Sequence, residues 1–537
     1  MSKAKRDLLQ RYLAGEVNHS PREIERRAVG KLPQLSFGQE RMWFLDQLIP
    51  GSAAFNVPIA VRLSTPLDLA VLEQSINEIV RRHDTLRTTV AKVGGQPKAV
   101  IAPYLNLTIP VVDLSCIAQH EKETMVWRLT SEEALRPFDL AKGPLIRVSL
   151  IKVGEDSHDL LVTMHHIISD GWSTVVFFQE LSRLYEAFLL GEPSPLSELP
   201  IQYADYAAWQ KEWLQGKVLQ KQLSYWKEKL GGDLPVLDLA TDRPRPSVLT
   251  HHGARKSLVL SRNLTEAIAA LSQHEGATLF MTLLAAFKVL LFRLTGLQDI
   301  IVGSPIANRS PIETEGLIGF FLNNIALRTD VSGKPNFRDF LARVRKTALE
   351  AYSNQDVPFE KLVEELNPDR NLSRTPVFQV FFNLLNFAEK IQLPGLAASD
   401  IAFVEAWSKP DNPSSQFDLT LYVAERTDAL QLVLLYNADI FDGDRITAML
   451  EQYRYLLEQI VNMPDAPISA YSLAMGGSNS VLPDPLDVLA EPIMESIPVT
   501  FFSRARSLPE HPAICCGQEV WTYLELARGA ESISRLL

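Results

Sequence analysis

The 537-residue chain has few cysteines and no excess of basic residues. Its three cysteines are Cys116, Cys515 and Cys516. This sparse, odd set argues against a disulfide framework and is typical of proteins that work in a reducing cytosol. The formal net charge of −11 lacks the basic excess of nucleic-acid binding proteins. The charged amino terminus has no apolar core of a signal peptide.

Long uninterrupted apolar runs are also lacking. The longest apolar segment, 277–294, is broken by Thr278, Thr282, Lys288 and Arg293. We therefore expect a buried helix there, not a membrane span. Together these absences predict a cytoplasmic protein that binds neither membrane nor nucleic acid.

The chain is too long for one hydrophobic core, and predicted helices and strands alternate through both halves. This pattern favours an α/β (α+β) protein with two lobes. A proline-rich stretch near the carboxyl end indicates a linker. We predict an N-terminal helix or linker at 1–30, a first lobe at 31–200, a second lobe at 201–465, an interdomain linker at 466–498 and a further segment at 499–537.

Local signals mark several elements. Strands at Val148–Val153 and Leu160–His165, joined by a Gly-Glu-Asp-Ser turn, predict a hairpin. Asp68 is the expected cap of one helix, and Ser173 is the expected cap of another. Gly296 is the expected carboxyl-terminal stop of the buried helix.

The stretch His165-His166-Ile167-Ile168-Ser169-Asp170-Gly171 is the most informative in the chain. Two imidazoles, an acid and a glycine directly follow a buried strand, and histidine titrates near neutrality, which suits proton transfer. An isolated His-His pair is more often core packing than catalysis. A zinc site is a poor fit, because no third histidine or clustered cysteine lies nearby in the sequence.

This stretch has the HHxxxDG form of the condensation domains of nonribosomal peptide synthetases, which are relatives of chloramphenicol acetyltransferase. Six further segments resemble that family's motifs in order and make the resemblance specific over roughly residues 30–465. These segments are Leu35–Leu45, Arg82–Thr88, Tyr203–Trp209, Ile318–Asn324, Asn354–Glu360 and Arg370–Pro376.

The resemblance implies two chloramphenicol-acetyltransferase-like lobes in a V shape, with the active site in a tunnel between them. Segments near Gly316–Asn324 and Asn383–Gln416 are expected to cross from the second lobe to the first. Residues 499–537 resemble the first residues of an adenylation domain, which predicts a fragment of a larger synthetase. His165 in place of aspartate, and Trp172 directly after the glycine, favour the subtype that takes an L-configured donor.

The implied reaction is amide formation, in which an acceptor α-amine attacks a donor thioester. Both substrates would be delivered on the 4'-phosphopantetheine arms of donor and acceptor peptidyl carrier proteins. No covalently bound cofactor and no metal are expected. An adjoining adenylation domain is the expected neighbour in a full synthetase, and the excised chain is expected to be a monomer.

The resemblance also assigns roles to individual residues. His166 is either the base for the tetrahedral intermediate or a positioner of the amine, and His165 is expected to pack or to bond the backbone. Asp170 is expected to form a structural ion pair with Arg309, or as second choice with Arg87. Gly171 is expected to approach the substrate, and weaker candidates for oxyanion or substrate contact are Ser304, Trp172 and Asn323.

Two other functions stay open at this stage. A free-standing acyltransferase would use coenzyme A thioesters and would need no carrier protein. A recruitment module would have a degenerate active site, whereas the second histidine and the aspartate are both present here.

Overall fold

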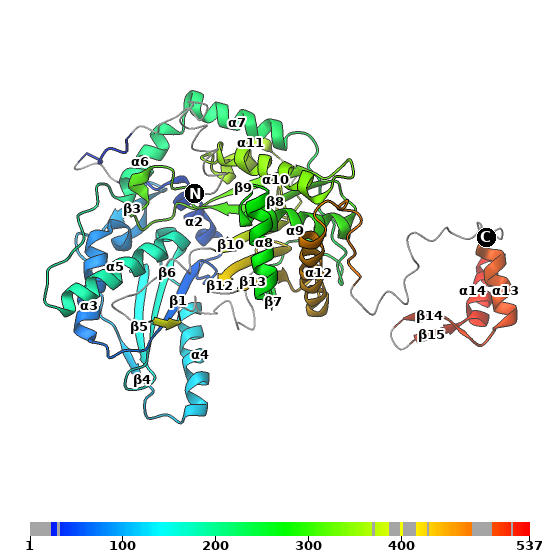
Figure 1. Cartoon of the computed structure of the whole chain (residues 1–537), viewed down its shortest axis with the longest axis horizontal. Coiled ribbons are helices and arrows are strands. Elements are labelled where there is room, and N and C mark those ends of the chain that lie inside the picture. The colour runs from blue at the N-terminus through cyan, green and yellow to red at the C-terminus, as the bar shows by residue number, and fades with distance from the viewer. Residues whose placement is uncertain are drawn as a thin grey trace. The chain divides into compact units, whose positions relative to one another are not determined.

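The structure is a computed structural model that describes residues 23–28, 33–367, 371–385, 398–400, 415–426, 429–474, 497–516 and 519–536. The chain divides into two compact units, Met1–Leu473 and Ala474–Leu537. The first unit contains two large mixed sheets covered by helices (Figure 1).

Five strands form the first sheet, in the order β11 (Ala398–Asp400), β1 (Asn56–Leu63), β6 (His158–His165), β5 (Ile146–Lys152) and β4 (Val111–Asp113). Every residue of β6 is buried. Its side chains alternate, so Leu160 and Val162 join one core while Leu161 joins a smaller cluster on the opposite face. β5 and β6 pair antiparallel, which confirms the predicted hairpin.

The elements that accompany this sheet are α2 (Phe37–Leu48), α3 (Leu69–Arg82), η1 (Asp84–Arg87), the hairpin β2 (Thr88–Val93) and β3 (Gln96–Ile101), α4 (Gln119–Leu135), η2 (His166–Ile168) and α5 (Gly171–Leu189). α3 and α5 share the core that contains Leu160, whereas α4 covers the Leu161 side. The Asp68 side chain caps α3 as predicted. β6 is thus held between helices on both faces of the sheet.

The second sheet has the order β7 (Gly253–Val259), β13 (Ala429–Asn437), β12 (Leu419–Arg426), β10 (Val380–Leu385), β8 (Asp299–Ile306) and β9 (Asn323–Asp330). β10 runs parallel to β8 and β12, and the other neighbours pair antiparallel.

The helices of this half are α6 (Tyr203–Trp213), α7 (Gly216–Leu230), α8 (Arg262–His274), α9 (Leu279–Thr295), η3 (Ile312–Thr314), α10 (Phe337–Tyr352), α11 (Phe359–Leu366) and α12 (Gly443–Asn462). α9 is the predicted buried helix, and it ends at Gly296 in the left-handed conformation at φ 73°. Among the described helices, no single one is long and apolar enough to cross a membrane, and α8 with α9 passes that test only as a pair bent by 105°.

Two segments of the second half reach the first lobe, as predicted. β11 adds to the sheet edge by pairing with β1. Residues 314–322, which we call the crossover segment, hydrogen-bond to α5 and to His83. The site at the end of β6 is therefore built from both lobes.

The predicted cap of α5 was wrong. Asp170 occupies the N-cap position, and its carboxylate accepts the backbone N–H of Ser173. Ser173 lies within the first turn of the helix. It donates hydrogen bonds to the capping residue and is not the capping residue itself. The helix predicted within residues 1–30 lies largely outside the described residues; of this stretch, Ile24 packs with Leu199 and Tyr203.

The second unit contains α13 (Ile497–Ser507), β14 (Pro512–Cys516), β15 (Glu519–Thr522) and α14 (Tyr523–Leu536). β14 and β15 pair antiparallel. Several large apolar side chains are exposed here, including Val499, Val520, Trp521 and Ile533. The described part of this unit therefore buries little apolar surface of its own.

Candidate active site

The end of β6 places the two histidines in different surroundings. His165 pairs with Asn56 of β1, and the His166 backbone N–H donates to the Phe55 carbonyl at 2.8 Å. The strand then gives way to η2, and α5 begins at Gly171. The seven residues of the motif thus form a short strand-to-helix connection.

His166 is half-buried and its tautomer is set by the backbone. Its Nδ1 atom lies 2.7 Å from the Ser169 carbonyl, which can only accept a hydrogen bond. Nδ1 therefore carries the proton, and Nε2 is left with a free lone pair. Burial lowers the pKa of His166 below its ordinary value of 6.5, against the opposing effects of the Ser169 carbonyl and the Asp170 charge. The ring is neutral near pH 7 and can accept a hydrogen bond.

His165 points into the protein. Its Nδ1 accepts the Ile167 backbone N–H at 3.0 Å, and its ring lies edge-on to Phe55 and Phe138. Burial, followed by the neighbouring His166, lowers the pKa of His165 to about 3. The buried, neutral His165 ring therefore helps to hold the loop around His166 in shape, through its hydrogen bond with the Ile167 backbone.

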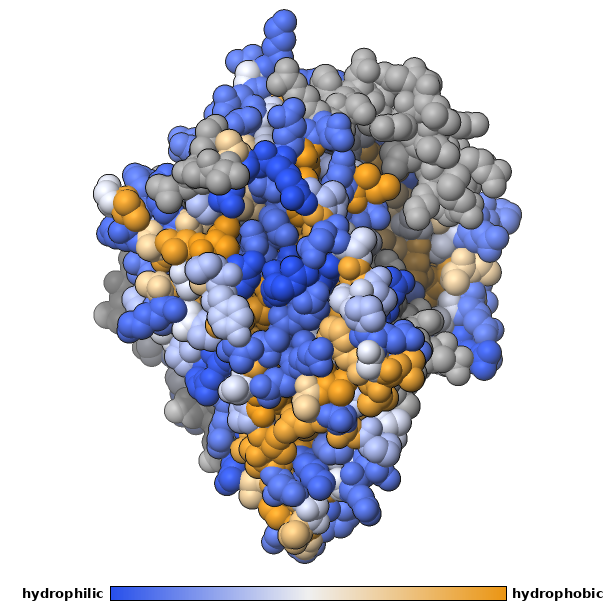
Figure 2. Space-filling view, turned by 90° about the vertical axis from the view of Figure 1, so that its left-hand side faces the viewer, coloured by the Kyte–Doolittle hydropathy of each residue, from blue (hydrophilic) through white to orange (hydrophobic). Residues whose placement is uncertain are grey.

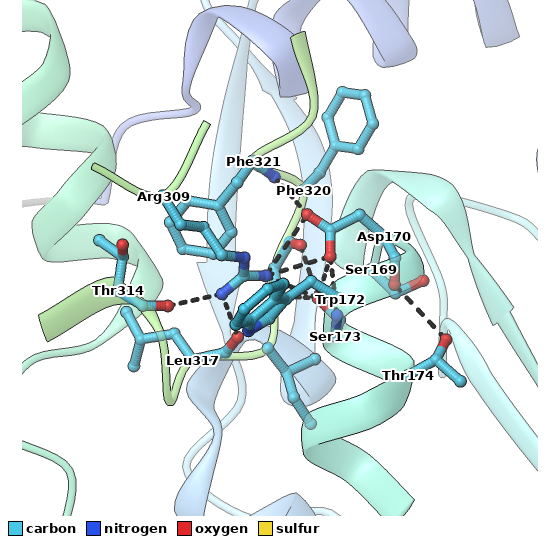
Figure 3. Close-up of polar contacts among 12 residues, drawn as sticks. Ser169, Asp170, Trp172, Ser173, Thr174, Arg309, Thr314, Leu317, Phe320 and Phe321 are labelled. Carbon is cyan, nitrogen blue, oxygen red and sulfur yellow. Dashed lines mark hydrogen bonds and ion pairs between the residues drawn. The ribbon is translucent and has the colours of Figure 1, made fainter. Parts of the chain in front are cut away.

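Asp170 and Arg309 form a buried ion pair, with each side chain only 3% exposed and 3.1 Å between Nη2 and Oδ1 (Figure 3). The second-choice partner, Arg87, instead pairs with Asp84 at 2.5 Å. The Asp170 carboxylate also accepts from Ser173 Oγ at 2.7 Å and from the Phe321 N–H at 3.0 Å. Every contact of this carboxylate is thus a structural one within the protein.

Arg309 ties the crossover segment to the same place. Its Nη1 donates to the carbonyls of Thr314 and Leu317, and its guanidinium lies over the Phe321 ring at 3.9 Å (Figure 3). Removing one partner of such a buried pair typically costs about 3–5 kcal/mol, because the other charge is left unpaired.

Gly171 and Trp172 open α5. Gly171 is the first helical residue, so its N–H has no acceptor within the helix and lies at the positive end of the helix dipole. The Trp172 indole N–H donates to the Glu315 carbonyl at 2.8 Å. Trp172 therefore links α5 to the crossover segment.

Ser304 and Asn323 lie on adjacent strands of the second lobe and differ in their hydrogen bonding. Ser304 of β8 is buried, and its hydroxyl has no partner among the described residues. The Asn323 amide of β9 donates to the Gln355 and Val357 carbonyls and accepts two backbone N–H groups. Asn323 has no hydrogen-bonding capacity left for a substrate, whereas Ser304 does.

Sequence reasoning missed a second set of residues around the site. The Gln39 amide donates to the Ile167 carbonyl at 3.1 Å, and His83 accepts from the Ile318 N–H. The Tyr203 hydroxyl donates to the Phe320 carbonyl at 2.5 Å. Each of these three residues lies in one of the family motifs. Their contacts are with partners more than a hundred residues away, and no local sequence pattern predicts such contacts.

Among the described residues, no group of three histidine, cysteine or acidic side chains is placed to hold a metal ion.

Comparison with known proteins gives related sequences over most of the chain. The family described as "Condensation domain" matches residues 31–482. A polypeptide of the linear gramicidin synthase of Brevibacillus parabrevis is 45% identical over 505 residues, which make up 94% of this chain and 6% of that polypeptide. The chain thus spans a small part of that relative's length.

Solved structures share the fold. The X-domain from teicoplanin biosynthesis, solved in complex with OxyB, matches with a TM-score of 0.72 and 28% identity, over 85% of this chain and 99% of that one. The first condensation domain of the calcium-dependent antibiotic synthetase, solved with a substrate analogue, matches with a TM-score of 0.70 and 20% identity, over 83% of this chain and all of that one. This likeness confirms the predicted pair of chloramphenicol-acetyltransferase-like lobes.

Proposed function

The chain belongs to the condensation domain family, the peptide-bond-forming acyltransferases of nonribosomal peptide synthetases, and we propose that it joins a donor thioester to an acceptor α-amine at His166. The observation that carries this proposal is the tautomer of His166. Its Nδ1–H is held by the Ser169 carbonyl, so Nε2 presents a lone pair at the carboxyl end of β6.

The reaction needs little activation of the nucleophile. An ordinary α-amine has a pKa of about 7.7–8.0, so roughly a tenth of it is neutral at pH 7. The amine nitrogen bonds to the thioester carbonyl carbon, the C–S bond breaks, and one N–H proton leaves with the thiol of the donor arm. His166 Nε2 accepts a hydrogen bond from the attacking amine throughout this exchange.

Positioning is the larger contribution in this proposal. The lowered pKa of His166 disfavours its protonated form, so the ring holds a proton poorly and passes it on readily. Holding two tethered substrates together can supply an effective molarity of about 10⁵–10⁸ M. General-base catalysis typically contributes about 10²–10⁴ in rate. Tethering of the substrates therefore supplies the larger part of the rate, and His166 adds to it by orienting the amine or by relaying its proton.

The neighbours take supporting roles. The N–H of Gly171, which has no acceptor within α5, and the hydroxyl of Ser304, which has no partner among the described residues, are the groups suited to contact the substrate or the oxyanion. Asp170 and Arg309 hold the loop, and His165 packs beneath it. Trp172 and Asn323 are better assigned to the framework, because both bond backbone groups of the protein.

The partners follow from the reaction. We propose that donor and acceptor peptidyl carrier proteins deliver both substrates on 4'-phosphopantetheine arms. The arms would enter a tunnel between the first lobe, near 31–200, and the second lobe, near 201–465. One face of the protein shows apolar patches between hydrophilic areas (Figure 2), and such patches often mark sites of protein contact. From the sequence resemblance we further propose an L-configured donor and an adenylation-type segment at 499–537. From the sparse cysteines we propose a cytoplasmic location.

The recruitment-module alternative also has support, since the X-domain that shares this fold was solved in complex with OxyB. The His166 geometry and the intact Asp170–Arg309 pair favour catalysis, because a module that only docks a partner has no need of an oriented imidazole.

A single-turnover assay followed by intact-protein mass spectrometry tests the proposal. A donor-loaded carrier and an acceptor-loaded carrier are mixed with wild type, His166→Ala or His120→Ala, and folding is checked by circular dichroism. His120 is the matched control, because its side chain is 80% exposed on α4.

We expect transfer by wild type and by His120→Ala, and a loss of about a hundredfold or more in folded His166→Ala. Acylation of amines from coenzyme A thioesters, without transfer between carriers, would instead establish a free-standing acyltransferase. Carrier binding with no activity in either format would favour the recruitment module.

A further inference from the structure

Side chains of the first lobe accept hydrogen bonds from the backbone of the crossover segment. Its Ile318 N–H donates to His83 Nδ1 at 3.3 Å, and its Gly319 N–H donates to Ser173 Oγ at 3.0 Å. The Phe321 N–H donates to Asp170 at 3.0 Å. Buried backbone N–H groups require acceptors, so these three side chains help to fix the segment, together with its contacts to Arg309, Trp172 and Tyr203 described above.

His83 is the acceptor that lies farthest along the chain from the HHxxxDG motif. The ring is 1% exposed and follows directly after α3. Since Nδ1 accepts the Ile318 N–H, the neutral ring carries its proton on Nε2, which lies 3.1 Å from Glu180 Oε2. His83 thus connects α5 to the crossover segment, with one ring nitrogen serving each side.

The Glu180 carboxylate that contacts His83 is itself paired with Arg82. Glu180 also takes two hydrogen bonds from the Arg82 guanidinium, at 3.0 and 3.1 Å. Arg82 and Glu180 balance each other's charge inside the lobe. The carboxylate is therefore held in place by Arg82 and can orient the His83 ring, as a second group orients the imidazole in many active sites.

The crossover segment in turn touches His166. The Phe320 ring lies edge-on to the His166 ring, with 5.0 Å between centroids. The same ring packs against α2 at Gly38, where an added Cβ would lie 2.8 Å from it. Ile318 lies two residues before Phe320, so a shift of the backbone there would disturb the packing of the Phe320 ring against His166.

We propose that His83 is a positioning residue for amide-bond formation: its Nδ1 atom holds the Ile318 N–H and so keeps the crossover segment, with Phe320, packed against His166. This inference rests on the proposed function and adds a residue to its site. His83 does not touch the substrate, and it acts through the backbone of the crossover segment.

Two substitutions separate the two nitrogens of the ring. His83→Gln places an amide near the position of Nε2, so it keeps the contact with Glu180 and loses the acceptor for Ile318. His83→Asn places an amide near Nδ1, so it keeps that acceptor and loses Glu180. His120→Gln makes the same change at an exposed site and is the control.

The single-turnover assay is run over a range of concentrations of the loaded carriers. We expect His83→Gln to lower the maximal rate by up to about a hundredfold, since small misplacements in an active site have effects of this size. The half-saturating carrier concentrations should stay unchanged, because carriers do not dock at His83. His83→Asn should retain most of the wild-type rate, and His120→Gln all of it.

Hydrogen exchange of peptides covering residues 314–322 gives a readout that needs no turnover, and we expect faster exchange in His83→Gln than in His83→Asn. Equal rates for wild type and His83→Gln, or an equal or greater loss in His83→Asn, would overturn the inference. The inference would also be overturned if circular dichroism showed that either variant does not fold, because the His83 ring would then be needed for folding of the whole lobe. Absence of product with wild type counts against the proposed function, and the exchange comparison still decides whether His83 holds the segment.

Discussion

Buried charge is handled differently at the junction of the two lobes and in the core of the second lobe. At the junction, Asp170 of the first lobe pairs with Arg309 of the second. Within the first lobe, Glu180 likewise pairs with Arg82. In the second lobe, Lys288 of α9 is fully buried and donates to the Leu327 carbonyl at 2.6 Å and to the Thr329 hydroxyl at 2.7 Å, both uncharged. A charged partner offsets part of the cost of burying a charge, whereas a lone buried ammonium tends to lose its proton.

The largest effect is expected from breaking the junction pair. Arg309→Met leaves the Asp170 carboxylate buried without its partner, and we expect the free energy of unfolding to fall by about 3–5 kcal/mol. Adding Asp170→Asn should recover part of this loss, because the uncompensated charge is then gone. Urea denaturation of the two single variants and the double variant measures both effects. A double variant as unstable as the sum of the singles would show that the two side chains act independently.

Lys288 should make the stability of the folded protein depend on pH in the alkaline range. Burial lowers the pKa of Lys288 to about 7 from 10.5. Between these pH values the unfolded chain binds more protons than the folded one, so the free energy of unfolding should rise with pH from about 7 to 10.5. Below about pH 7, Lys288 is protonated in both states, and the folded protein carries the full cost of burying the charge. The slope due to this group is at most about 1.4 kcal/mol per pH unit.

Lys288→Met tests this by removing the titrating group. We expect the variant to be more stable than wild type near pH 7 and the gap to shrink as the pH approaches 10.5. Denaturation curves at several pH values give the difference directly. A constant gap across that range would mean that Lys288 keeps its proton in the folded protein.

The packing of the crossover segment allows a smaller, steric comparison. A Cβ on Gly319 would lie 2.0 Å from the Tyr203 ring, whereas a Cβ on Gly316 would meet nothing within 4 Å. Gly319→Ala should therefore cost about 1–3 kcal/mol through overpacking and should slow amide formation. Gly316→Ala, in the same segment, should change stability by no more than about 0.5 kcal/mol. Thermal unfolding and the transfer assay compare the two, and equal effects would contradict the close packing at Tyr203.

The smallest effect is expected from a surface pair. Arg81 contacts Glu78 and Glu198, but its side chain is 55% exposed. Arg81→Ala should change the free energy of unfolding by about 0.2–1 kcal/mol, because exposed pairs are screened by water and salt. A loss comparable with that of Arg309→Met would show that exposure is a poor guide to the value of an ion pair here.

Much of the fold could be predicted from local patterns. The cap at Asp68, the β5–β6 hairpin, the buried helix α9 and its stop at Gly296 all follow from residues a few positions apart. The cap of α5 was assigned wrongly because Asp170 and Ser173 both suit that position, and only the geometry of the turn shows which one accepts the hydrogen bond.

The sequence by itself indicated the family and the strand-to-helix setting of the HHxxxDG motif, and it ranked Arg309 ahead of Arg87 as partner for Asp170. Tertiary structure alone decided that the Asn323 amide is used up within the protein, that Arg87 pairs with Asp84, and that His83 holds Ile318 from 235 residues away. Capping and periodicity depend on near neighbours, which the sequence displays directly. Which distant groups meet depends on how the two lobes pack, because a buried polar atom takes whichever partner the packing brings within reach.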